Sequence, residues 1–131
     1  MINRGELRRV ARERLKDAEA LLRCNRCDGA VYLAGYVVEI ALKARICRTL
    51  KWRGFPETGA EFKNFQSFKV HDLDVLLTLT GLEPRIKAKY FAEWSVVAEW
   101  NPEARYKAPG MTTKADAHLF VEAAKTLLGV L

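Results

Sequence analysis

Apolar residues return every three or four positions along most of the chain, which is the spacing of one face of an α-helix. The first apolar stripe predicts a helix over residues 3–25, whose other faces carry arginine and lysine. The next run predicts a central helix from Asp28, as its N-cap, to Arg53, because its apolar residues cover more than one face. No segment alternates apolar and polar residues strictly enough to predict a strand.

Residues 54–70 interrupt this periodicity. Gly54 and Pro56 are expected to end the second helix, and the phenylalanines that follow predict a long loop pinned to the core. The pattern then predicts three further helices, with Thr113 as the N-cap of the last, over residues 71–80, 84–100 and 113–130. The sequence therefore predicts an all-α fold, a single up-and-down bundle of four to five helices in one domain, 1–131.

Composition is compatible with such a bundle. Of the 131 residues, 50% are hydrophobic and 29% are charged, which is typical of one globular domain with a core of its own. The first residues are charged throughout and do not resemble a secretory signal, and no apolar run approaches the length of a membrane span. We expect a cytoplasmic protein that has no membrane partner.

The positive charge is concentrated in the first part of the chain. Residues 1–53 contain 13 Lys and Arg against 6 Asp and Glu, whereas residues 54–131 contain 9 against 10. An excess of this kind can mark a face that binds a polyanion. The alternative is a helix surface that is simply solvated, and the sequence leaves both open.

Three cysteines raise the question of a metal site. Cys24 and Cys27 form a CxxC pair, but structural zinc needs four ligands. Cys47 lies about 30 Å further along a continuous helix, and His71 and His118 are isolated in the sequence. We therefore expect reduced thiols, no metal and no cofactor.

A polar stripe runs along the second predicted helix. Tyr32, Tyr36, Glu39 and Lys43 follow one another at steps of three and four, so they share one face. Glu39 and Lys43 could form a structural ion pair, or Glu39 could orient Lys43 toward a phosphate. The tyrosines could pack in the core or an interface, or stack on bases.

Three segments resemble the HEPN family of small helical domains, named for nucleotide binding in higher eukaryotes and prokaryotes. Residues 28–46, DGAVYLAGYVVEIALKARI, are similar to the second helix of that family through Tyr36, Glu39 and Lys43. His71-Asp72-Leu73 resembles a recurrent helix start, and Arg105-Tyr106 resembles a recurrent piece before the last helix. The order and spacing of these pieces cover most of the chain.

The resemblance implies a homodimer that acts beside a minimal nucleotidyltransferase and binds a nucleotide or RNA. Toxins, antitoxins and accessory subunits share this architecture. The residues that it would place at a ligand or anion site are Tyr36, Glu39, Lys43, His71, Asp72, Arg105 and Tyr106.

Some HEPN proteins are metal-independent ribonucleases, in which an Arg precedes a His by four to six intervening residues. Here 17 residues separate Arg53 from His71, and 12 separate Arg105 from His118, so the motif is absent. We therefore expect a binding module, not an enzyme. The alternatives are an RNA-cleaving toxin with a displaced pair, His71 and Arg105, or a scaffold or antitoxin subunit that binds no ligand.

Structural roles remain open for the same residues. His71 could cap and pack a helix, and Arg105 could anchor a loop through a carboxylate. His118 is expected to be packed within the last helix, and Trp94 and Trp100 are expected in the core or a dimer face.

Overall fold

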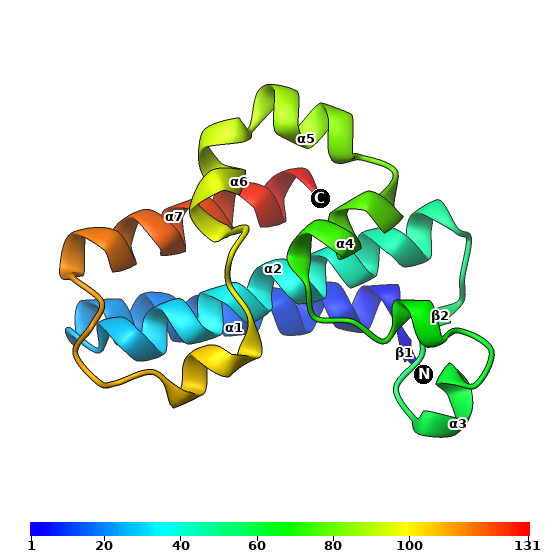
Figure 1. Ribbon diagram of the computed structural model, residues 1–131, viewed down its shortest axis with the longest axis horizontal. Helices are drawn as coiled ribbons and strands as arrows, with labels where there is room; N and C mark the ends of the chain where they lie inside the picture. The colour runs from blue at the N-terminus through cyan, green and yellow to red at the C-terminus, as the bar shows by residue number, and fades with distance from the viewer.

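The computed structural model describes residues 1–131 and confirms the all-α prediction (Figure 1). It contains seven α-helices, more than the four to five expected, because a short helix forms in the predicted loop and one predicted helix is divided. The helices are α1 Arg4–Arg23, α2 Cys27–Thr49, α3 Gly59–Phe62, α4 Leu73–Thr80, α5 Glu83–Lys89, α6 Phe91–Val97 and α7 Lys114–Val130. No helix is both long and apolar enough to cross a lipid bilayer.

The long helices α1, α2 and α7 form the body of the bundle, with α4 and α6 packed over them (Figure 1). The stripe of α1 is buried through Leu7, Ala11 and Ala18, as expected, and Leu15 is buried with them. The stripe residues Val10, Leu21 and Leu22 are only partly buried. α2 is apolar around most of its circumference because α1, α4 and α7 all pack against it. It is the central helix that its sequence predicted.

α2 ends earlier than the sequence indicated. The helix stops at Thr49 instead of Arg53, and Lys51 adopts a positive φ of 56° that turns the chain away. The chain then enters β2 (Gly54–Phe55), which pairs antiparallel with β1 (Ile2–Asn3). The expectation of no strand was wrong here, because a two-residue strand is too short to show alternation.

Residues 56–70 are not a plain loop. They contain α3, capped by the Thr58 side chain, and a 3₁₀ turn η1 (Gln66–Phe68). Phe55 and Phe62 are buried, and the Trp52 ring centroid lies 4.7 Å from that of Phe68. The predicted attachment to the core is confirmed, although Phe65 remains 40% exposed.

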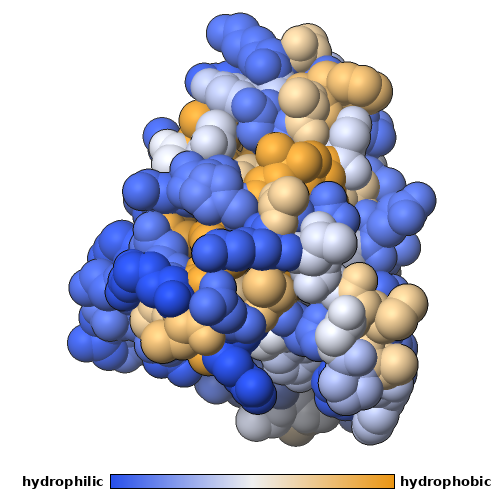
Figure 2. Space-filling model, turned by 90° about the vertical axis from the view of Figure 1, so that its left-hand side faces the viewer, coloured by the Kyte–Doolittle hydropathy of each residue, from blue (hydrophilic) through white to orange (hydrophobic).

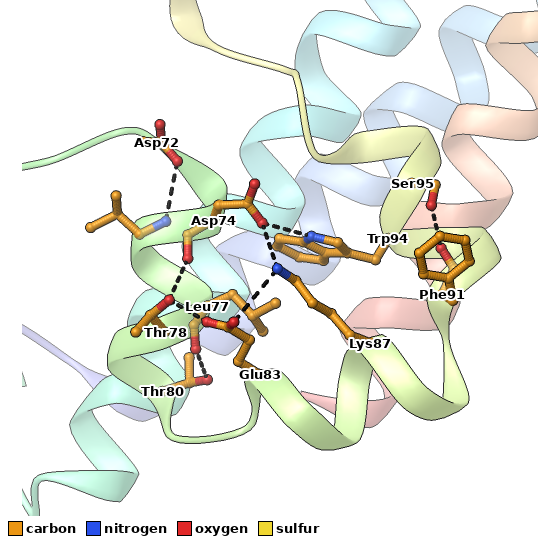
Figure 3. A network of polar contacts seen from close by, with 11 residues as sticks. Asp72, Asp74, Leu77, Thr78, Thr80, Glu83, Lys87, Phe91, Trp94 and Ser95 are labelled. Atoms are coloured by element: carbon orange, nitrogen blue, oxygen red, sulfur yellow. Dashed lines mark hydrogen bonds and ion pairs between the residues drawn. The ribbon is translucent and has the colours of Figure 1, made fainter.

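The predicted helix over 84–100 is divided at Tyr90, whose backbone is not helical, into α5 and α6. Polar contacts join α4, α5 and α6 across this turn (Figure 3). Trp94 Nε1 donates to Asp74 Oδ1 at 2.9 Å, and Lys87 Nζ lies 3.6 Å from carboxylate oxygens of both Asp74 and Glu83. The turn lets α6 pack on α7, and both Trp94 and Trp100 are buried, as expected.

Two predicted N-caps have different outcomes. Thr113 caps α7, since its hydroxyl accepts from the Asp116 amide at 3.1 Å, as predicted. Asp28 does not cap α2, which begins one residue earlier with Arg26 at the cap position. The Asp28 carboxylate instead accepts from the amides of Gly110 (2.6 Å) and Thr112 (3.2 Å), and so holds the loop before α7.

Candidate functional site: a polar cluster on α2

The polar stripe of α2 meets two residues from distant segments. His71 reaches it from the turn before α4, and Arg105 from the 3₁₀ turn η2 (Pro102–Tyr106). We call these residues the Glu39 cluster: Tyr32, Tyr36, Glu39, Lys43, His71 and Arg105. Four of them come from one helix because steps of three and four residues stay on one face.

Glu39 is the centre of the cluster. Its side chain is only 4% exposed, and its two oxygens face two different bases. Oε1 lies 2.6 Å from His71 Nδ1, and Oε2 lies 3.7 Å from Lys43 Nζ. A carboxylate this buried needs such partners, because a lone charge in the interior is strongly unfavourable.

His71 is held at one ring nitrogen and open at the other. The short contact uses Nδ1, while the side chain remains 60% exposed. Anchoring Nδ1 on a carboxylate orients the ring and leaves Nε2 available to a ligand. This differs from a histidine that merely packs at a helix start.

Lys43 is held from two sides. Besides Glu39, its ammonium lies 5.3 Å from the centroid of the Phe55 ring, a cation–π contact. Its side chain is 18% exposed, so a charged group is kept at the edge of the cluster. β2 therefore contributes to the cluster through Phe55.

The two tyrosines form an aromatic layer with Trp100. The rings of Tyr32 and Tyr36 are edge to face at 5.3 Å, and Tyr36 and Trp100 at 4.9 Å. Trp100 packs directly on Gly35, where a Cβ atom would lie 1.9 Å from the indole. Glycine at this position is therefore what allows the indole to lie against α2.

Arg105 covers the other end of the layer. Its guanidinium lies 4.7 Å from the centroid of the Tyr106 ring, and the phenol groups of Tyr106 and then Tyr32 raise its pKa. Burial, followed by the Tyr32 phenol and the Glu39 charge, raises the pKa of Tyr36 to about 12, and Arg105 opposes that shift. Tyr36 thus lies within the fields of both Glu39 and Arg105.

Of the remaining predicted site residues, Asp72 lies apart from the cluster and Tyr106 touches it only through Arg105. Asp72 caps α4 by accepting from the Val75 amide at 3.1 Å, and it forms no hydrogen bond or ion pair with the cluster. Tyr106 is 73% exposed and contacts Arg105. His118 is exposed on α7, so the expectation that it is packed was wrong. His118 lies on the face of α7 that is turned away from the core, and the apolar residues next to it in the sequence do not indicate that face.

His71 and Arg105 reach the same side of α2 without touching. No hydrogen bond or salt bridge joins them, and the charges of Glu39 and Arg105 shift the pKa of Tyr36 in opposite directions. No group of three or more His, Cys, Asp and Glu side chains is placed to hold a metal ion. Chemistry at this cluster would rest on one imidazole, two cations and a buried carboxylate.

A hollow of about 320 Å³ adjoins the aromatic layer. Tyr32 and Trp100 form one wall, and residues from η2 and α7 form the others. Three acidic residues, Asp28, Glu99 and Asp116, line it against one cation, Lys107. This negative excess favours an uncharged or hydrogen-bond-donating group there over a phosphate.

The sequence showed the basic excess of the first helices but not where it gathers. Arg4, Arg8, Arg45, Arg48 and Arg85 line a separate cleft of about 520 Å³. The only signal available in the sequence was the charge asymmetry, because the residues come from three helices.

Neither a protein-family model, nor a curated protein, nor a solved structure matches this chain. The HEPN resemblance and the functions that it implies therefore stay predictions.

Proposed function

We propose that the protein is a nucleotide- or RNA-binding module whose Glu39 cluster contacts a phosphate group. The observation that carries this proposal is the buried Glu39 carboxylate, which holds His71 and Lys43 side by side at the edge of the fold. Arg105, on the same side of α2, adds a cation whose ordinary role is to bind phosphate oxygens. The adjoining hollow offers Tyr32 and Trp100 to a base or ribose.

The proposal is tested by the affinity for a mixed-sequence, single-stranded RNA oligonucleotide, followed by fluorescence anisotropy. We expect Arg105→Gln to weaken binding about tenfold, because a hydrogen bond to a charged group is lost. Arg23→Gln, an exposed arginine at the end of α1 that belongs neither to the cluster nor to the lining of the hollow, removes the same charge and should change affinity less than about twofold. Equal losses in both variants would show that only net charge matters and would refute a phosphate contact at the cluster.

Lys43→Gln provides a second test within the cluster. Since Lys43 is partly buried, circular dichroism must first show that the variant is folded. Lys89→Gln, on the exposed surface of α5, is the matched control. RNA affinity should fall in the first variant and persist in the second.

A second candidate function, metal-independent RNA cleavage, is favoured by the 2.6 Å contact between His71 Nδ1 and Glu39 Oε1. A carboxylate-anchored imidazole can accept the proton of a ribose 2′-hydroxyl through Nε2. The 2′-oxygen would then attack phosphorus, the bond to the 5′-oxygen would break, and the 5′-oxygen would take a proton from water. Arg105 would stabilise the charge on the phosphorane.

Cleavage is tested with pure protein and RNA in excess chelator. His71→Ala should abolish the cleavage, whereas His118→Ala, an exposed histidine on α7, should not affect it. RNA that stays intact with the wild-type protein would eliminate the enzyme and leave the binding module. Cleavage that survives His71→Ala in the folded variant would also eliminate His71 as the group that moves the proton.

Association with another subunit completes the proposal. Apolar residues gather in the upper centre of the view in Figure 2, which looks onto the end of the molecule where α7 begins. Phe91 is 68% exposed and Leu119 is 56% exposed, and Leu119 lines a hollow of about 300 Å³ between α6 and α7. These features support a homodimer, which sedimentation of the wild type and Leu119→Glu would test. Association with a minimal nucleotidyltransferase stays a prediction.

A further inference from the structure

A second charged site lies on the opposite side of α2 from the Glu39 cluster. Arg4 and Arg8 extend from the start of α1, Arg45 and Arg48 from the last turns of α2, and Arg85 from α5. The start of α1 and the ends of α2 and α7 lie at the same end of the bundle (Figure 1). We call the space between these residues, about 520 Å³, the arginine cleft.

No Asp or Glu side chain lines the arginine cleft. Its other lining residues are Ala44 and, at the carboxyl end of α7, Gly129, Val130 and Leu131, where the helix dipole offsets only part of the positive charge. None of its five arginines forms a salt bridge to a carboxylate. By contrast, exposed Arg14 on α1 is paired with Asp17 at 3.2 Å. Five guanidinium groups therefore repel one another around one space.

Arg45 is the most constrained of the five. Its Nε is buried and has no hydrogen-bond partner. Burial lowers the pKa of Arg45, and the charges of Arg48, Arg85, Arg4 and Arg8 lower it further. A buried N–H donor without a partner costs free energy, and so does the crowding of positive charges around Arg45. An anion in the cleft would relieve the repulsion.

We propose that the arginine cleft binds a chain of three or more phosphates, either free or carried by a nucleotide. Guanidinium groups bind phosphate oxygens in pairs of parallel hydrogen bonds, and several converging forks match an anion with several charges. The volume of the cleft falls within the range of small-molecule sites. A single phosphate would leave most of the five arginines unpaired.

The lining also indicates what is not recognised. No aromatic ring and no side-chain amide faces the cleft, so no group is present that would stack on a base or read its edge. Single-stranded RNA is bound mainly through such stacking platforms. The cleft therefore selects phosphate number and leaves a nucleoside outside.

The first experiment measures binding of inorganic tripolyphosphate by titration calorimetry. Arg8→Gln and Arg48→Gln should each weaken binding about tenfold or more, because each loses charged hydrogen bonds. Arg23→Gln is the control: it lies about 22 Å along α1 from Arg8, beyond the Debye length of ordinary buffer. We expect a change of less than about twofold there. An equal loss in Arg23→Gln, or no binding by the wild type, would overturn the proposal.

The source of the phosphates is separated by comparing nucleotides. ATP and GTP should bind about as tightly as tripolyphosphate, and AMP at least about tenfold more weakly. Free tripolyphosphate binding much more tightly than ATP would assign the cleft to inorganic polyphosphate. AMP binding as tightly as ATP would refute selection by phosphate number. The cleft would be an RNA-binding surface instead if Arg8→Gln weakened RNA binding and tripolyphosphate did not displace the RNA.

A further measurement needs no ligand. Arg45→Met removes one of the crowded charges and the unpaired Nε while it keeps the length of the side chain. The melting temperature of this variant should exceed that of the wild type by about 2–4 °C. Tripolyphosphate should raise the melting temperature of the variant less than it raises that of the wild type. The proposal would be contradicted by a variant that melts at a lower temperature than the wild type and whose melting temperature tripolyphosphate raises as much as that of the wild type.

The arginine cleft and the Glu39 cluster are tested separately. Arg105→Gln should weaken RNA binding and leave tripolyphosphate binding unchanged, and Arg8→Gln should do the reverse. If Arg8→Gln does not weaken tripolyphosphate binding, the proposal for the Glu39 cluster still stands. If Arg105→Gln does not weaken RNA binding, the proposal for the arginine cleft still stands.

Discussion

Glu39 and His71 are separated by 32 positions in the chain, and yet their side chains meet at 2.6 Å. The contact joins the middle of α2 to the segment that leads into α4, so it links the core helix to the edge of the fold. The carboxylate is buried and the imidazole is exposed, so a rigid group of the core holds the ring of a surface residue in place. A hydrogen bond at one ring nitrogen orients the imidazole and fixes the role of the other nitrogen.

Removing the charge of Glu39 tests that support. Glu39→Gln keeps the shape but leaves Lys43 and His71 without an anionic partner, so we expect the free energy of unfolding to fall by about 1–3 kcal/mol. Urea unfolding measures the change. Glu13→Gln, which affects an exposed ion pair with Lys16, should change stability by less than about 0.5 kcal/mol. Equal effects would mean that burial of Glu39 does not matter.

Gly35→Ala tests the contact between α2 and Trp100. A Cβ atom at this position would lie 1.9 Å from the indole, so the ring must move and we expect a loss of about 1–3 kcal/mol. Gly129→Ala is the control, since nothing lies within 4 Å of that position in α7 and alanine favours helix there by up to about 1 kcal/mol. Unfolding and tryptophan fluorescence report both changes. An unaltered fluorescence in Gly35→Ala would contradict the packing.

The hydrogen bonds of the Asp28 carboxylate should make the stability of the fold depend on pH in the acidic range. The Gly110 amide first, and then the Thr112 hydroxyl and amide, lower the pKa of Asp28 below its ordinary value of 3.8. Stabilisation from this carboxylate is thus complete above about pH 4 and is lost as the pH falls through the lowered pKa. Asp28→Asn should remove that part of the pH dependence and speed hydrogen exchange at the two amides. In Asp17→Asn, an exposed residue of α1, both amides should exchange as in the wild type.

The raised pKa of Tyr36 should make the stability of the fold depend on pH in the alkaline range. Folding raises the pKa of Tyr36 from 10.0 to about 12, so its stabilisation is present below pH 10 and is lost as the pH rises through about 12. Thermal unfolding across this window should be less pH-dependent in Tyr36→Phe than in the wild type. The rise in phenolate absorbance near pH 12 should also disappear in the variant. A wild type that shows no such rise would refute the shift.

Local patterns in the sequence were sufficient for the long helices and one face of the site. The steps between Tyr36, Glu39 and Lys43 required them to share a face, and the structure places them there. Thr113 was recognisable because its capping hydroxyl acts on an amide three residues away. Such features depend on short-range geometry, which the residue order largely determines.

Long-range contacts explain what the sequence did not reveal. Asp28 has the composition of an N-cap, but amides 82 and 84 positions away compete for its carboxylate. The break at Tyr90 serves the packing of α6 on α7, and no proline or glycine marks it. The convergence of His71 and Arg105 on α2, and of the arginines in their cleft, depends on how the helices pack.

α2 also acts as a partition. Tyr32, Tyr36, Glu39 and Lys43 leave it on one side, whereas Arg45 and Arg48 leave it about 180° away at 100° per residue. Anions held on both sides would be separated by at least a helix diameter of about 10 Å, comparable with the Debye length at ~0.1 M salt. Their mutual repulsion would be weak, so each side could fill regardless of whether the other is occupied. If both proposals hold, one helix would separate two anion sites that fill independently.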